Sequence, residues 1–206
     1  MNIIGINRWF KGQTDGRSRF TVPDGNEEWK IISKPLGNSL VPGFAGAPGF
    51  ELVPGNGGLR APSYDQTTDE EQFVTIDIPM DYKLGIEMIA YLDWCPRTSE
   101  GGRVIWGMEY SGYPQGQNKV ISADGSSNAG SKIIYAEDWS PNVEGLVREV
   151  RMVNNVRLNM PRHTFMIRLF RHASDPRDTL NTDAMALSLL VHYQADTIGG
   201  STETGK

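Results

Sequence analysis

Apolar and polar side chains alternate with a period of two from Phe73 onward, which is typical of strands with one buried face. The alternation is clearest in four runs, residues 86–94, 103–110, 165–170 and 185–193. It is weaker in four more, residues 73–79, 118–123, 131–136 and 146–153. Turn-forming Gly, Pro, Asn and Asp separate the runs, and no long helical pattern is present. The pattern predicts about eight strands and an all-β fold.

The alternation also predicts which side chains are buried. We expect one face of the first clear run and one face of the last to lie in the core: Ile86, Met88, Ala90, Leu92 and Trp94, and Met185, Leu187, Leu189, Val191 and Tyr193. Two packed antiparallel sheets bury such faces, and a jelly roll is the usual arrangement of eight strands. We therefore expect an antiparallel two-sheet sandwich that is jelly-roll-like.

The first 70 residues follow a different pattern. Their apolar residues form short clusters between turn-forming residues, and the segment from Pro35 to Pro62 holds seven glycines and five prolines. Its Pro-Gly pairs favour type II turns. We expect an extended, loop-rich N-terminal arm over residues 1–70, a β-sandwich domain over 71–198 and a polar C-terminal tail over 199–206.

The expected arm carries large apolar side chains that a freely solvated linker would not need. These side chains either hold the arm on its own domain or dock it on a neighbouring subunit, and the sequence leaves both interpretations open. If the arm docks, we expect its largest side chains to bind the partner: Trp9, Phe10, Trp29, Phe44, Phe50 and Leu52.

Composition narrows the classes of function. The net charge of −5 and the pI near 5.2 argue against a protein that neutralises nucleic-acid phosphates. Cys95 is the single cysteine, which excludes an intrachain disulfide and a cysteine-rich metal site. The N-terminus lacks the pattern of a secretory signal, and no stretch is apolar enough to span a bilayer. We expect a protein made in the cytoplasm that binds neither nucleic acid nor a membrane.

Residue types that support catalysis are present without the spacing that catalysis needs. The three histidines, His163, His172 and His192, have no metal-type spacing, and no Gly-x-Ser-x-Gly motif is present. Nothing around Cys95 would lower its pKa, so we expect a buried thiol there. The C-terminal sequence GSTETGK has the glycine and lysine spacing of a phosphate-binding loop, but we interpret it as a polar tail. We predict no catalytic residue, no cofactor and no metal.

An acidic segment offers oxygen atoms that calcium could use. It reads Ser174-Asp175-Pro176-Arg177-Asp178-Thr179 and is followed by Asp183. The segment lacks the Asp-x-Asp-x-Asp-Gly spacing of a calcium loop. We favour a turn in which the Asp side chains bond their own backbone and Arg177.

Aromatic and basic residues give two further hypotheses. Trp94 and Trp106 share faces with apolar neighbours and are expected in the core, whereas Tyr113 and Trp139 lie near turns and are candidates for contact with a ligand. Six arginines could form a local positive surface, although we favour an ordinary solvated face: Arg148, Arg151, Arg157, Arg162, Arg168 and Arg171.

Four blocks of the second region resemble a family of small structural proteins from tailed-bacteriophage particles. The blocks read AYLDWCP at 90–96, VIWGMEY at 104–110, RLFRHASDPRDTL at 168–180 and LVHYQADTIG at 190–199. The most specific feature is the order of these elements: a strand, an acidic turn, a second strand and then the sequence Asp-Thr-Ile-Gly. The family has a histidine-rich first block where this chain has Tyr91 and Asp93, so no role of those histidines carries over.

The resemblance implies a jelly-roll-like virion component that is not an enzyme. The first role it implies is a capsid cement or decoration protein, which binds the major capsid protein on the outside of the head. The alternative is a head- or tail-fibre module that binds a host receptor or glycan. We expect the first role, filled by a homotrimer on the capsid surface whose arms strengthen binding through multivalency.

Overall fold

The fold is known from a computed structural model that describes residues 10–12, 18–20, 28–38, 46–55, 57–115, 131–158 and 162–195. Within these residues the chain forms antiparallel strands and one short 3₁₀ turn, η2 (Leu36–Asn38). The all-β prediction is confirmed. The strand expected at 118–123 lies outside the described residues.

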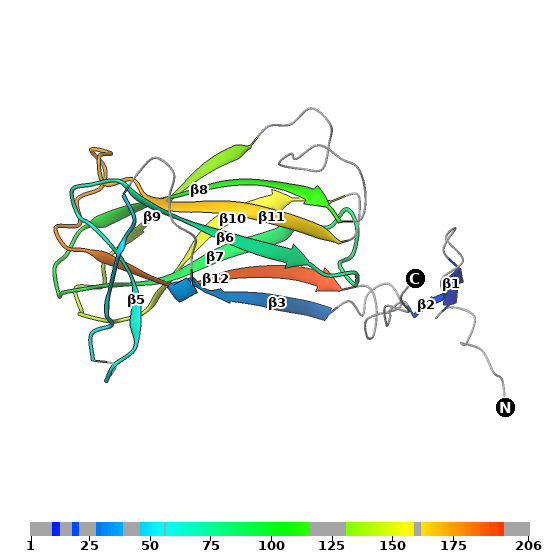
Figure 1. Cartoon of the computed structure of the whole chain (residues 1–206), viewed down its shortest axis with the longest axis horizontal. Coiled ribbons are helices and arrows are strands. Elements are labelled where there is room, and N and C mark those ends of the chain that lie inside the picture. Colours follow the sequence, from blue (N-terminus) through cyan, green and yellow to red (C-terminus); the bar gives the residue numbers. More distant parts are fainter. Residues whose placement is uncertain are drawn as a thin grey trace.

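Two sheets pack face to face as a sandwich (Figure 1). The four-stranded sheet contains, in spatial order, β6 (Glu70–Ile78), β11 (His163–Arg171), β8 (Arg103–Pro114) and β9 (Lys132–Trp139). The six-stranded sheet contains β10 (Arg148–Val156), β7 (Met88–Pro96), β12 (Ala184–Ala195), β5 (Arg60–Tyr64) and β4 (Gly49–Leu52), with β3 (Glu28–Pro35) also paired to β12. A separate hairpin joins β1 (Phe10–Gly12) and β2 (Ser18–Phe20). The chain passes between the sheets after β5, β6, β7, β9, β10 and β11, as expected for a jelly-roll-like sandwich.

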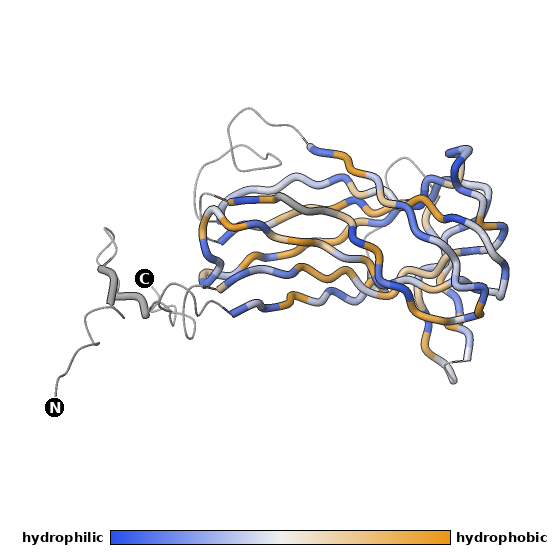
Figure 2. The backbone as a smooth tube through the Cα atoms, turned by 180° about the vertical axis from the view of Figure 1, so that it is seen from behind, coloured by the Kyte–Doolittle hydropathy of each residue, from blue (hydrophilic) through white to orange (hydrophobic). Residues whose placement is uncertain are grey.

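The inner faces of the two sheets form one apolar core. Trp94 and Trp106 are fully buried in it with ring centroids 6.2 Å apart, which confirms their predicted core positions. Figure 2 shows the alternation that produces this core as short hydrophobic and hydrophilic stretches along the strands.

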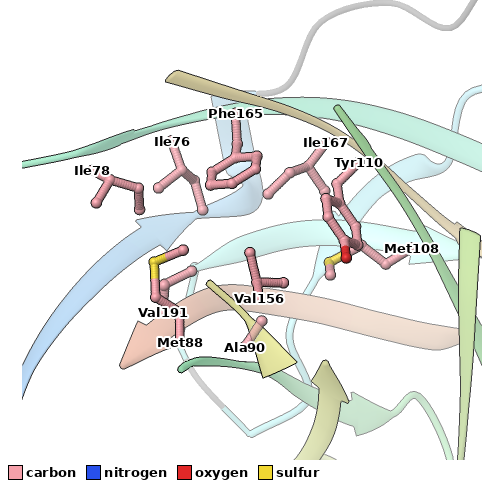
Figure 3. A pocket seen from close by; sticks show the side chains of 10 residues that line it. All are labelled: Ile76, Ile78, Met88, Ala90, Met108, Tyr110, Val156, Phe165, Ile167 and Val191. Atoms are coloured by element: carbon pink, nitrogen blue, oxygen red, sulfur yellow. The ribbon is translucent and has the colours of Figure 1, made fainter. Parts of the chain in front are cut away.

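A small cavity of about 30 Å³ remains between the sheets. Figure 3 shows apolar side chains from both sheets that point toward it. They are Ile76, Ile78, Met88, Ala90, Met108, Tyr110, Val156, Phe165, Ile167 and Val191. The core is therefore slightly underpacked at this point, since protein interiors leave few voids of this size.

A bulge in β12 overturns one prediction about burial. Leu187 is an extra residue between the pairs Ala186–Trp94 and Ser188–Asp93, so the alternation reverses at this point. Leu189 and the alternate residues that follow it face the main core, but Met185 belongs to a second apolar cluster. The prediction that Met185 and Leu187 share a face with Leu189 is therefore wrong.

The sandwich begins earlier in the chain than the expected boundary at residue 70. β3 pairs with β12 from Ser188 to Ala195, and β5 pairs with the start of β12. β3 is weakly patterned because it lies at a sheet edge, where one face is exposed and the other is only half-buried. For these strands the structure agrees with an arm held on its own domain. β4, in the same expected arm, pairs with β5. Residues 1–9, 13–17, 21–27, 39–45 and 56 of the expected arm and the whole tail over 199–206 lie outside the described residues.

Candidate functional site

The hairpin between β4 and β5 exposes apolar side chains at one end of the sandwich. It is closed by a hydrogen bond from the backbone nitrogen of Val53 to the carbonyl oxygen of Leu59 at 2.8 Å. Val53 is buried against Cys95 and Met185, but Leu52 and Leu59 are 54% and 62% exposed. The hairpin therefore has a buried anchor and an exposed apolar surface.

The loop that follows β9 extends this apolar surface. Val143, Leu146 and Val147 are each about half exposed. Gly145 has a φ of +68°, and a side chain there would lie 2.8 Å from the carbonyl oxygen of Pro54, so the loop rests directly on the hairpin. We name Leu52, Leu59, Val143, Leu146 and Val147 the hairpin-end cluster.

The predicted partner-binding residues are only partly brought together. Phe50 and Leu52 lie on β4 and are exposed, whereas Trp29 is exposed on β3 in another part of the same sheet. Trp9, Phe44 and the side chain of Phe10 lie outside the described residues. The sequence reasoning did not single out Leu59 or the loop 143–147, although apolar residues inside a turn between two strands were a usable signal.

A second exposed surface lies on the outer face of β9. Alternation places Ile133, Tyr135, Glu137 and Trp139 on this face, and the three apolar residues are 47–56% exposed. The Arg103 guanidinium lies over the Trp139 ring, 4.8 Å from its centroid, and its Nη1 is 3.3 Å from Glu137. Trp139 is thus exposed on this face, while the other contact candidate, Tyr113, is half-buried in β8.

Tyr135 was missed by the sequence reasoning, and it belongs to an aromatic group. Its ring meets Phe170 edge to face at 5.9 Å and His172 at 5.5 Å. Phe170 lies across Gly107, where a Cβ would be 2.1 Å from the ring, so any side chain at that position would displace the ring. His172 Nδ1 is 3.3 Å from the Asp69 carboxylate. The ring of Tyr135 is therefore held from one side and exposed on the other.

Charged side chains brace the same face. Arg168 lies over the Phe170 ring at 4.5 Å and bonds both the buried carboxylate of Glu71 and, at 3.0 Å, Glu109. Partial burial acts to lower the pKa of Arg168, but the hydrogen bonds to Glu71 and Glu109 raise it above its ordinary value. Arg168 therefore stays charged and ties three strands together.

The acidic segment is a turn, as the sequence predicted. The Asp175 carboxylate accepts hydrogen bonds from the backbone and side chain of Arg177, which lower the pKa of Asp175. Asp178 forms a buried ion pair with Arg171, and Arg171 also donates to the carbonyl oxygens of Leu180 and Thr182. Among the described residues, no group of three or more His, Cys, Asp or Glu side chains is placed to hold a metal ion.

The histidines and the cysteine do not converge on a common site. His163 is buried beside Phe165, and the His192 ring lies tilted against Tyr91 on the outer face of the other sheet. Cys95 is fully buried, and desolvation raises the pKa of its thiol to about 11, so the predicted buried thiol is confirmed.

The six arginines do not form one positive surface. Arg171 is buried, Arg168 pairs with two glutamates, and Arg148 binds Asp138 at 2.8 Å. Arg157 pairs with Glu87. Within the described part of the chain, no helix has the length and hydrophobicity needed to cross a bilayer.

No known protein family matches the sequence, and no curated protein matches it either. Two solved structures resemble the fold. One is the exo-β-1,3-galactanase Pc1,3Gal43A from Phanerochaete chrysosporium, solved with galactose, with a TM-score of 0.40 and 13% identity over 87% of this chain and 31% of that chain. The other is dimeric latent PorU from Porphyromonas gingivalis, with a TM-score of 0.27 and 10% identity over 85% of this chain and 14% of that chain. The chain spans less than a third of either protein, and likenesses this distant carry no argument about function.

Proposed function

We propose that the chain is a structural protein of a bacteriophage particle, a capsid cement or decoration protein that binds the major capsid protein on the outside of the head. The proposal joins the sequence resemblance to one observation, the hairpin-end cluster. Five large apolar side chains that remain about half exposed on the hairpin and the loop beside it are typical of a surface that binds another protein.

Burial of this cluster supplies the binding energy. A Val or Leu side chain that is half exposed gains about 1 kcal/mol when a partner covers the rest of it. A homotrimer would present three such clusters to a lattice of capsid subunits, and the second and third contacts would form at high effective concentration. Weak single contacts would then add up to stable attachment.

Co-sedimentation with empty heads tests the proposal. Heads would be assembled from the major capsid protein of the same genome and mixed with the full chain or with the double variant Leu59→Ser/Leu146→Ser. We expect the double variant to lose most of its occupancy. Leu84→Ser is a matched control, because Leu84 is 41% exposed on the loop at the opposite end of the sandwich, between β6 and β7.

Two outcomes would overturn the proposal. The first is full occupancy by a folded double variant, and the second is the absence of this chain from purified mature particles, measured by mass spectrometry. Light scattering checks the oligomer separately, and we expect about three times the chain mass of 22.8 kDa.

The contribution of the arm needs a deletion that spares the sheet. Removal of residues 1–65 would take away β3, β4 and β5, which are strands of the six-stranded sheet. Removal of residues 1–27 spares all strands of both sheets of the sandwich. We expect this shorter deletion to keep the folded sandwich and to lower head occupancy.

A further inference from the structure

The outer face of β9 combines exposed rings with polar groups along a sheet edge. Tyr135 and Trp139 lie four residues apart on the same face, which separates their Cα atoms by about 13 Å along the strand. Glu137 lies between them with half of its side chain exposed. The face therefore presents two ring surfaces with a carboxylate between them.

Both rings are held in place before any ligand arrives. Arg103 fixes one side of Trp139, while Phe170 and His172 fix one side of Tyr135. Phe170 is itself fixed between Gly107 and Arg168. A ligand that stacks on these rings loses less affinity to side-chain ordering, because these contacts already restrict the rings.

The polar groups lie where they can bond hydroxyl groups beside the rings. Glu137 supplies acceptors and Arg103 supplies donors next to Trp139, and the His172–Asp69 pair lies next to Tyr135. Sugars present an apolar ring face together with hydroxyl groups at the ring edge. This combination matches aromatic surfaces that are flanked by charged hydrogen-bonding groups.

We infer that the outer face of β9 is a carbohydrate-binding surface on which Tyr135 and Trp139 stack against separate rings of an extended oligosaccharide. The Arg103–Glu137 pair in the middle of the face disfavours a protein partner, because the centre of a protein interface is depleted of charged residues. The exposed carboxylate of Glu137 and the acidic net charge disfavour nucleic acid. The inference holds whether or not the chain is part of a virion.

A glycan array tests the inference with the full chain as the probe. The array would carry bacterial O-antigen, capsular and peptidoglycan-derived oligosaccharides, and calorimetry would measure the affinity for the strongest ligand. We expect Tyr135→Ala and Trp139→Ala each to weaken binding about tenfold, because each removes one stacking surface. We expect Trp139→Phe, which keeps an aromatic face, to stay within a few-fold of the wild type.

Trp29→Ala is the matched control, since Trp29 is 48% exposed but lies on the other sheet. We expect it to bind glycan like the wild type, and thermal melting would establish that every variant is folded. The inference is overturned if the wild type binds no glycan on the array. It is also overturned if a folded Trp139→Ala variant binds as tightly as the wild type, or if Trp29→Ala weakens binding as much as Trp139→Ala does.

Discussion

The outer faces of the two sheets differ in how their side chains are held. On the four-stranded sheet, rings and charges contact one another in a continuous group that runs from Arg168 through Phe170 to Tyr135. On the six-stranded sheet, one end is covered by the chain's own hairpin, while Trp29 and Ile31 on β3 are about half exposed. One sheet therefore braces its outer side chains in a continuous group, whereas the contacts on the other are local, such as that of His192 with Tyr91.

This difference suggests different kinds of partner for the two regions. A braced surface keeps one geometry and so favours a small ligand whose groups must be matched one by one. Apolar side chains on loops, such as Leu59 and Leu146, can adjust to the shape of another protein. The proposed carbohydrate surface and the proposed capsid contact follow this division.

The largest effect is expected from a substitution that removes a charge from the outer face of the four-stranded sheet. Arg168→Met removes the guanidinium that bonds the buried carboxylate of Glu71, and we expect a loss of about 3 kcal/mol in the free energy of unfolding. Arg151→Met is the control on the other sheet, where an exposed arginine should contribute less than about 0.5 kcal/mol. Urea denaturation measures both, and equal losses would show that the two outer faces are not held differently.

Burial of Cys95 at the covered end of the six-stranded sheet makes the free energy of unfolding depend on pH. The thiol of Cys95 keeps its proton up to about pH 11 in the folded state, whereas an unfolded thiol loses it near pH 9. The unfolded state therefore gains stability as the pH rises through this window, and the contribution of this thiol is complete only below about pH 9. We expect the wild type to lose roughly 2–3 kcal/mol more than Cys95→Ala between pH 8 and pH 11. If the free energy of unfolding fell by the same amount in both proteins between pH 8 and pH 11, the thiol would not be buried beneath the hairpin.

Packing beneath the rings gives a somewhat smaller expected effect. Gly107→Ala places a methyl group where the Phe170 ring lies, and we expect a loss of about 2 kcal/mol as the ring is displaced. Gly49→Ala on the six-stranded sheet meets only ordinary contacts at 3.8 Å or more, so we expect little change. Thermal denaturation compares the two, and a Gly107→Ala variant as stable as Gly49→Ala would show that Phe170 is not held tightly.

Most of the sandwich could be predicted from alternation, because burial of one face constrains every second residue. Alternation did not predict the edge strand, nor the burial of residues on both sides of a bulge. β3 exposes one face and only half-buries the other, and the extra residue Leu187 reverses the alternation within β12. Neither feature leaves a clear period in the sequence.

The two surfaces were less predictable than the fold. Trp139 was a candidate because it lies beside a turn, but the partners of Tyr135 come from a distant strand and its flanking loop. The contact between the hairpin and the loop 140–147 depends on the approach of Gly145 to Pro54. Such proximity arises only when the sheets are assembled, so the sequence alone does not reveal it.

The smallest expected effect concerns the interior that both sheets share. Ala90 on β7 lines the cavity opposite Phe165 and Ile167, so Ala90→Val adds two methyl groups where space exists (Figure 3). We expect the free energy of unfolding to rise by about 0.5–1 kcal/mol. Ala186→Val is the matched control on the same sheet, because Ala186 is fully buried outside the cavity and the added groups should cost about 1–3 kcal/mol. If both variants lost stability equally, the space beside Ala90 would be too small for a side chain, and the two inner faces would fit each other as tightly there as elsewhere.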